Sequence, residues 1–328
     1  MAISESHSTS CRRLAELIHI SHDSVNRFLL RERYTPFDLF NDVKSDLILK
    51  GGTLSVDDTV LDKPYRKLMA FVGHFWSGKH HGVVKGINLI TLYYTDPHGH
   101  HQPINDRIYN KADNKTKNDY FQEMFVEVCG WGLEPDFITG DSWYSSGSNL
   151  KMIKNNHRGF LFALESNRLV SLEKGKWSQV QRLAIPEDGL VVWLRGFGTI
   201  KLFRTPLKDQ LRHYALYQPN DDLWAAFDRP VFLKLHDQHW QIEQYHRTLK
   251  QVCHLEHFQV RQGTAIRNHL FAAIFGYTQL QRLCATDVLR HCYALQRDLF
   301  NDVVASFIRM FMPSMEHVNP QFRPSVNA

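Results

Sequence analysis

The order of β-type and helix-type patterns between residues 50 and 165 restricts the fold more than any other feature of this sequence. Three β-type runs come first, in "GGTLSVDDTVL", "LMAFVGHFW" and "GVVKGINLITLYYT", and the turn-rich "DPHGHHQPIND" leads into a further hairpin strand. An amphipathic helix follows in "KTKNDYFQEMFVEVCGWG", ended by Gly130 and Gly132. Strand, helix and strand come next. This order predicts an α/β fold, a mixed sheet with helices packed on it.

The rest of the chain divides around this core. Short β-type runs such as "RLVSL" and "GLVVWLRGFGTIKLFR" predict a β-rich insertion, and helices are expected to resume at about residue 237. The predicted parts are an N-terminal helical region (1–48), a catalytic-core candidate in two pieces (49–165 and 231–285), the insertion (166–230) and a C-terminal helical region (286–328).

The N-terminal region has two interpretations. "HISHDSVNRFLL" predicts a turn and a helix, with Ser21 or Asp23 as the N-cap. In a DNA-binding helix-turn-helix, this second helix would present a set of polar side chains to a groove: His22, Ser24, Asn26 and Arg27. In a plain helical hairpin, the apolar side chains would be buried instead: Leu14, Leu17, Val25, Phe28 and Leu29. Both interpretations stay open.

Composition sets broad limits. Lys and Arg number 39 against 34 Asp and Glu, and this net charge of +5 permits a polyanionic partner without requiring one. The five cysteines are widely spaced and include no Cys-x-x-Cys pair, which argues against a disulfide framework or a structural zinc site. No run approaches the roughly 20 apolar residues of a membrane span, and no signal-peptide pattern is present, so we expect a cytoplasmic protein without a membrane association.

Four acids stand where they could carry chemistry. Asp57 and Asp58 are expected at the end of one strand, Asp141 at the end of another, and Glu243 on a helix after the insertion. Carboxylates packed together raise one another's pKa, and divalent cations relieve that repulsion. Oxygen ligands favour Mg²⁺ or Mn²⁺, and two such ions about 3.5–4 Å apart can activate a water or a 3′-hydroxyl for phosphoryl transfer.

Three stretches together resemble the DDE transposases of bacterial insertion sequences, of the type with a Y-R-E-K signature. These stretches are "SVDDT", "FITGDSWYSSGSNLKMIKNNHRGFLFALESN" and "HDQHWQIEQYHRTLK". The resemblance runs from about residue 50 to 270 and implies an RNase H-like core with a β-rich insertion. It implies that Asp57, Asp141 and Glu243 are catalytic residues that bind two Mg²⁺ (or Mn²⁺) ions.

The activity that the resemblance implies is Mg-dependent DNA nicking followed by strand transfer through attack of a 3′-hydroxyl. The implied partners are the terminal inverted repeats of the element and target DNA, with a dimer in the DNA complex. Two alternatives remain. One is an RNase H-like nuclease that cuts without strand transfer, and the other is a domesticated, non-catalytic DNA-binding protein.

The chain departs from the signature before the glutamate. The positions of the expected Tyr and Arg are occupied by His236 and His239, whereas Lys250 stands at the expected offset after Glu243. We therefore expect DNA phosphate contacts from Lys250, Arg247, His239 and His236. At the first motif the Asp-x-Thr spacing favours Asp57, and Asp58 remains the alternative first-motif acid.

Two further groups of residues have a functional and a structural interpretation. Trp177 and Trp193 lie in the predicted insertion, where a family member's tryptophan can stack on a flipped base, although a core position in a small β-sheet is the commoner role. His98, His100 and His101 could suggest zinc, but Pro97 and Gly99 favour an exposed hairpin tip.

Overall fold

The computed structural model describes residues 11–65, 68–173, 175–207, 210–220, 224 and 226–294 of the chain. Most of the predicted C-terminal region, residues 286–328, lies outside these ranges. None of the helices in the described part has the length and apolar character that crossing a bilayer requires.

In the described residues, strands β1 to β11 form a single mixed sheet. Their bounds are β1 (Thr53–Asp62), β2 (Gly73–Ser77), β3 (Gly82–Thr95), β4 (His101–Ile108), β5 (Phe137–Gly140), β6 (Gly159–Leu164), β7 (Leu169–Ser171), β8 (Trp177–Gln179), β9 (Leu190–Leu194), β10 (Gly198–Leu207) and β11 (Gln210–Tyr217).

The central part of the sheet has the strand order β4-β3-β1-β5-β6. β3 is antiparallel to both β1 and β4, whereas β5 runs parallel to β1 and β6 runs parallel to β5. β1 and β3 are largely buried, as expected for strands covered on both faces. The predicted mixed sheet flanked by helices is confirmed, and its strand order is consistent with an RNase H-like core.

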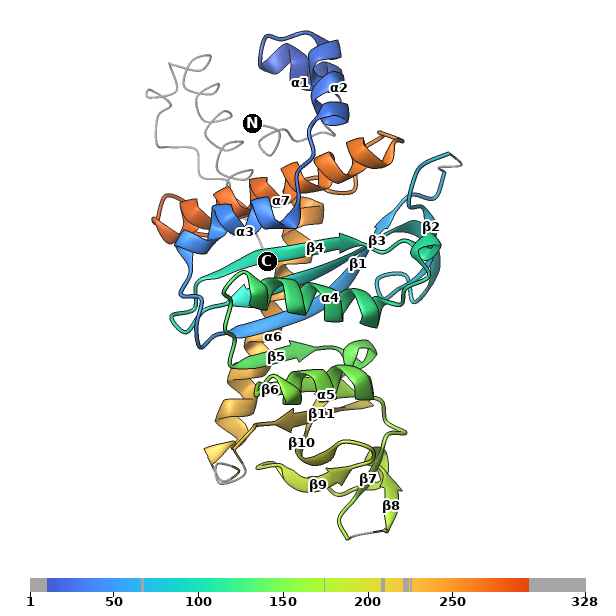
Figure 1. Ribbon diagram of the computed structural model, residues 1–328, viewed down its shortest axis with the longest axis vertical. Coiled ribbons are helices and arrows are strands. Elements are labelled where there is room, and N and C mark those ends of the chain that lie inside the picture. The colour runs from blue at the N-terminus through green and yellow to red at the C-terminus, as the bar shows by residue number, and fades with distance from the viewer. Residues whose placement is uncertain are drawn as a thin grey trace, which may run out of the picture.

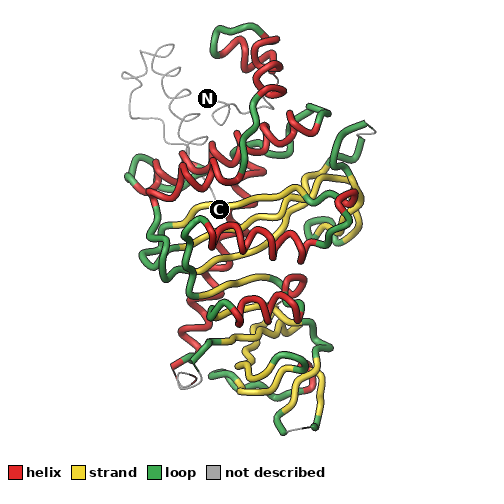
Figure 2. Tube along the Cα trace, viewed as in Figure 1, coloured by secondary structure: helices red, strands yellow, loops and turns green. Residues whose placement is uncertain are grey.

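Helices cover both faces of this sheet. Their bounds are α1 (Cys11–Leu17), α2 (His22–Arg31), α3 (Pro36–Val43), α4 (Lys117–Gly130), α5 (Gly147–Asn155), α6 (Arg229–Gln251) and α7 (Gly263–Ala285). In Figure 1, α4 and α5 lie in front of the sheet, the long α6 crosses behind it, and α1 and α2 stand apart at the top. Figure 2 shows how far the strands extend beyond the central part, towards the bottom of the view.

Local sequence explains where two of these helices begin. Thr116 caps α4 in a capping box with Asp119, and the predicted apolar face is buried: Phe121, Met124, Phe125 and Val128. Asp228 caps α6 by accepting from the N–H of Val231. The prediction that helices resume at about residue 237 was wrong, because Pro230 lies in the first turn of α6, where its missing N–H has no partner to lose.

The N-terminal helices agree only in part with the plain hairpin interpretation. Ser21 is the N-cap of α2 and accepts from the N–H of Ser24, as predicted. Val25 is buried, but the Phe28 side chain is 40% exposed, contrary to the plain hairpin prediction. The helix-turn-helix role remains a prediction.

Strands β7 to β11 lie within the range predicted for the insertion. β11 pairs antiparallel with β6, and β10 pairs with β11, so these strands continue the central sheet. β11 is therefore separated from β5 by β6 alone. This places β11 close to the end of β5, where Asp141 follows.

The close packing around Gly140, the last residue of β5, can be tested directly by mutation. A methyl group at Gly140 would lie 2.4 Å from Cε1 of Phe162 and 2.9 Å from Cγ1 of Val56. We expect Gly140→Ala to lower the free energy of unfolding by roughly 1–3 kcal/mol, because the buried neighbours must shift. Urea unfolding measures this change.

Gly147→Ala is the matched control, because a methyl group there meets nothing within 4 Å. Alanine also has the higher helix propensity, so the control should unfold at the same or a higher urea concentration. Equal unfolding midpoints for Gly140→Ala and the wild type would show that the Val56–Phe162 packing is not a constraint.

Candidate active site

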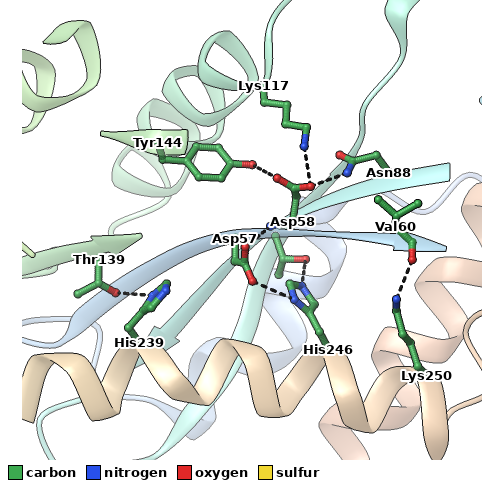
Figure 3. A network of polar contacts seen from close by, with 11 residues as sticks. Asp57, Asp58, Val60, Asn88, Lys117, Thr139, Tyr144, His239, His246 and Lys250 are labelled. Carbon is green, nitrogen blue, oxygen red and sulfur yellow. Dashed lines mark hydrogen bonds and ion pairs between the residues drawn. The ribbon is translucent and has the colours of Figure 1, made fainter. Parts of the chain in front are cut away.

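The first-motif acids lie in the middle of β1 and not at its end. We predicted that Asp57 and Asp58 end a strand, and this was wrong, because β1 continues to Asp62 through its pairing with β3. Successive strand residues point to opposite faces. Figure 3 shows Asp57 on the face covered by α6, whereas Asp58 points towards Lys117 and Tyr144.

Asp58 is held by three donors on its face of the sheet. It accepts from Lys117 Nζ (2.7 Å), from Tyr144 Oη (3.0 Å) and from Asn88 Nδ2. The Asp58 and Lys117 side chains are only 12% and 15% exposed, so this is a largely buried ion pair. Its geometry is that of a structural contact between β1 and α4.

Asp57 has a histidine as its partner on the other face. His246 Nδ1 lies 3.4 Å from Asp57 Oδ2, and the N–H of Asp58 donates to Asp57 Oδ1 (2.8 Å). Burial raises the pKa of Asp57, but the hydrogen bond and charge of His246 outweigh it, so this pKa lies below its ordinary value. Asp57 is therefore held as a carboxylate by its contact with His246.

Asp141 lies beside Asp57 because β5 is paired with β1. The parallel register sets Gly140 opposite Val56, so the acid that follows each of these residues comes at the same level. Asp141 also accepts from the N–H groups of Trp143 (3.0 Å) and Tyr144 (3.3 Å). Burial, followed by the negative charges of Asp57 and Asp58, raises the pKa of Asp141 to about 7.

Glu243 lies between the other two acids. It lines a cavity of about 270 Å³ together with Asp57 and His246, and a second cavity of about 210 Å³ together with Asp141. Burial and then the charge of Asp57 raise the pKa of Glu243. The three predicted catalytic acids therefore lie around two adjoining cavities and repel one another.

This acidic set fits a divalent cation chemically, because oxygen donors suit Mg²⁺ or Mn²⁺ and a cation would relieve the repulsion. However, the three carboxylates are not close enough together to share one ion. Within the described ranges, no three His, Cys, Asp or Glu side chains are close enough to hold one metal ion. The assignment of Asp57, Asp141 and Glu243 as metal ligands remains a prediction.

The predicted phosphate contacts differ in how available they are. Lys250 Nζ donates to the carbonyl of Val60 (2.7 Å) and pairs with Glu256 Oε1 (2.9 Å), so this ammonium group already has partners. Arg247 is exposed. His236 lines the second cavity.

His239 is poorly suited to bind phosphate as a cation. Its Nδ1 lies 3.2 Å from Thr139 Oγ1, so part of the ring's hydrogen-bonding capacity is used inside the protein. Burial lowers the pKa of His239 to about 4, so its ring is uncharged at neutral pH.

Sequence reasoning did not foresee the contacts of three residues near the acids: His246, Lys117 and Arg212. His246 could have been found, since it follows Glu243 by three residues and so shares its helix face. Lys117 and Arg212 reach the site from α4 and β11, which pattern analysis cannot place near it.

The structure also shows whether the insertion tryptophans and the turn histidines are buried or exposed. Trp177 and Trp193 are 42% and 55% exposed and line one cavity of about 640 Å³, so a core role for them was wrong. Base stacking by these tryptophans stays a prediction. His98 and His100 lie in the exposed β3–β4 turn, as predicted, and their backbone N–H groups donate to Asp96. The prediction was wrong for His101, which begins β4 and contacts Tyr93 Oη through its Nδ1.

Comparison with known families identifies the class of this protein. The family model described as "Transposase DDE domain" matches residues 50–278. The chain therefore belongs to the DDE transposase family, whose members are metal-dependent enzymes that act on DNA. No curated protein matches the chain.

Among solved structures, the strand transfer complex of the Drosophila P element transposase is 13% identical, with a TM-score of 0.28 over 54% of this chain and 45% of that one. Marinitoga piezophila Argonaute in complex with 5′ OH guide RNA is 10% identical (TM-score 0.22, 56% and 25% covered). The NurA nuclease from Sulfolobus solfataricus is 11% identical (TM-score 0.25, 91% and 96% covered). Scores this low do not bear on the function. The chain spans less than half of the P element transposase chain.

The raised pKa of Asp141 predicts a pH dependence of stability. In the metal-free protein, the folded state keeps this proton up to about pH 7, whereas an unfolded chain releases it near its ordinary pKa of 3.8. The free energy of unfolding should therefore fall as the pH rises through this window. Asp141→Asn should remove that fall, since the amide cannot ionise and can still accept from the helix N–H groups. Urea unfolding in EDTA across the window measures it.

Asp188→Asn is the control, because Asp188 is exposed and lies outside both cavities. It should leave the pH profile of the wild type unchanged. If Asp141→Asn and the wild type lose stability with pH at the same rate, the buried acid is not what drives the change.

Proposed function

We propose that this chain is the transposase of a bacterial insertion sequence of the Y-R-E-K type. It binds the terminal inverted repeats of its own element, nicks the DNA and joins the freed 3′-hydroxyl to target DNA. The observation that carries the proposal is the position of Glu243, which lines both cavities and so lies between Asp57 and Asp141. This arrangement occurs in a chain of the DDE family, whose family model matches residues 50–278 and so includes all three acids.

Asp57, Asp141 and Glu243 would hold two Mg²⁺ (or Mn²⁺) ions. When bound, such a pair of ions activates the attacking oxygen and stabilises the leaving oxygen of a phosphodiester. The protein's own contribution is to orient the acids. His246 fixes the Asp57 carboxylate, and the N–H groups of Trp143 and Tyr144 fix that of Asp141.

Of the two first-motif acids, Asp57 is the better candidate for the metal ligand. It shares the face of β1 with α6, which carries Glu243, whereas the Asp58 carboxylate already accepts from three donors on the opposite face. A carboxylate with an ammonium partner in a largely buried position would lose that pairing if it turned towards a metal.

DNA is the proposed partner, and a dimer is proposed in the DNA complex because transposition joins two ends. Arg247 and His236 lie on α6 beside the acids and remain candidates for phosphate contacts. A protein that acts on a bacterial element works where the chromosome lies, which gives the cytoplasm as the proposed location.

Glu243→Gln tests the proposed catalytic role. We expect nicking of supercoiled plasmid in Mg²⁺ to fall by more than about 100-fold, because even the outer-shell partners of a metal ligand are typically worth about 10–100-fold. Glu123→Gln on α4 is the control, since Glu123 is exposed, paired with Lys115 and outside both cavities.

If Glu243→Gln nicks as fast as the wild type, the catalytic assignment is wrong. A joining assay with pre-cleaved ends separates the two enzymatic alternatives, because a nuclease would hydrolyse DNA without joining it. Specific DNA binding by a wild-type protein that never nicks would identify the non-catalytic alternative.

Asn substitutions at the two first-motif acids test which one is the ligand. Asp57→Asn should abolish nicking with little loss of stability, because Asp57 has no buried ammonium partner. Asp58→Asn should lower the free energy of unfolding by up to about 3–5 kcal/mol, because Lys117 loses its buried partner. Urea unfolding and plasmid nicking, measured on both variants, give the answer. A stable Asp58→Asn protein without nicking activity would reverse the assignment.

A further inference from the structure

The second cavity has walls from two parts of the chain that are far apart in sequence. One wall is α6, with His239 and Glu243. The opposite wall is β10 and β11, with Thr205 and Arg212, and Asp141 lies at the end of β5 between them. The predicted insertion therefore contributes side chains directly to the site that holds two of the three acids.

Arg212 faces this cavity because of strand alternation. Tyr214, two residues further along β11, stacks edge-on against His236 of α6, with 5.4 Å between ring centroids. Residues two apart on a strand share a face, so Arg212 also points to the side of the sheet that α6 covers. Burial and then the charge of Asp57 raise the pKa of Glu243, and the positive charge of Arg212 partly offsets this rise, as expected for a guanidinium group near that carboxylate.

The lysines near the acids have partners. Lys250 is bound to the Val60 carbonyl and to Glu256, Lys117 is bound to Asp58, and Lys79 lies 3.4 Å from Asp62. Arg212 differs from them. It is exposed, and within the described ranges it has no hydrogen-bond or ion-pair partner. Its guanidinium group is therefore available to a ligand.

The position that the family resemblance gives to an arginine, four residues before Glu243, holds His239. Because this residue is a histidine, the helix position supplies no guanidinium group to the cavity. The His239 ring also contacts Thr139. Arg212 lines the same cavity from the opposite wall.

We propose that Arg212 binds a DNA phosphate in the second cavity, next to the scissile phosphodiester, and supplies from the insertion a guanidinium group that α6 does not contribute to this cavity. The planar guanidinium fork donates two parallel hydrogen bonds to phosphate oxygens, a geometry that an ammonium or an imidazole group cannot reproduce. This role rests on the proposed function, because it places the DNA strand between Asp141 and Glu243.

The first experiment measures DNA binding by Arg212→Ala, with a labelled random-sequence duplex in Ca²⁺, over a range of salt concentrations. Removing one phosphate contact should make the slope of log K against log salt shallower by about 0.9. Arg204→Ala is the matched control. Arg204 is an exposed arginine on β10 that is paired in register with His213, so it points to the opposite face of the sheet from Arg212. A slope that Arg212→Ala and Arg204→Ala change equally would overturn the proposal.

The second experiment measures plasmid nicking in Mg²⁺. Arg212→Ala should lose roughly 100–1,000-fold, the usual cost of removing a donor that stabilises charge in a transition state. Arg212→Lys should restore the salt slope but not the nicking rate, since it keeps the charge and loses the fork. Unchanged nicking by Arg212→Ala, next to an active wild type, would also overturn the role.

The outcomes separate this inference from the proposed function. A wild-type protein that does not nick DNA contradicts the proposed function, whereas the salt slope still decides whether Arg212 contacts phosphate. Urea unfolding of Arg212→Ala should match the wild type, because the side chain is exposed and without partners, so a loss of function cannot come from misfolding.

Discussion

The parallel pairing of β5 with β1 is the constraint on which the site depends. It sets Gly140 opposite Val56 and so brings Asp141 to the level of Asp57. The backbones and side chains are packed so closely there that a Cβ atom on Gly140 would overlap with Phe162 and Val56. Two acids from segments about 80 residues apart are thereby held side by side. The third acid depends on α6, which crosses the same face of the sheet.

Successive side chains of β1 point to opposite faces of the sheet, so the neighbouring acids Asp57 and Asp58 have different contacts. Asp58 stabilises the contact of β1 with α4 through Lys117, Asn88 and Tyr144. Asp57 faces α6, where His246 holds it near Glu243. Burial, and then repulsion from the neighbouring carboxylates, raises the pKa of Asp141 and Glu243, and a bound cation would relieve that repulsion.

Extension of the sheet by the β7–β11 strands changes how the site can work. Because β11 pairs with β6, its side chains reach the cavity beside Asp141 and Glu243, and Arg212 presents an exposed guanidinium group there. A cavity whose α6 wall carries no arginine can thus receive one from a strand. The signature around Glu243 alone would not indicate this.

The sequence by itself determined the order of the strands and helices in the core and the apolar face of α4, and it singled out the three acids as candidates, because each depends on local periodicity and on short motifs. It did not determine that β1 runs past Asp58, since a strand's length depends on its partner strands and not on its own pattern. The sequence also placed the start of α6 too late. A proline such as Pro230 is tolerated in the first turn of a helix, but only the fold shows that the first turn of α6 lies there.

The tertiary structure alone decided which acid faces α6, that Lys250 and His239 already have partners, and that Arg212 reaches the cavity. These are contacts between segments distant in sequence, which no local pattern encodes.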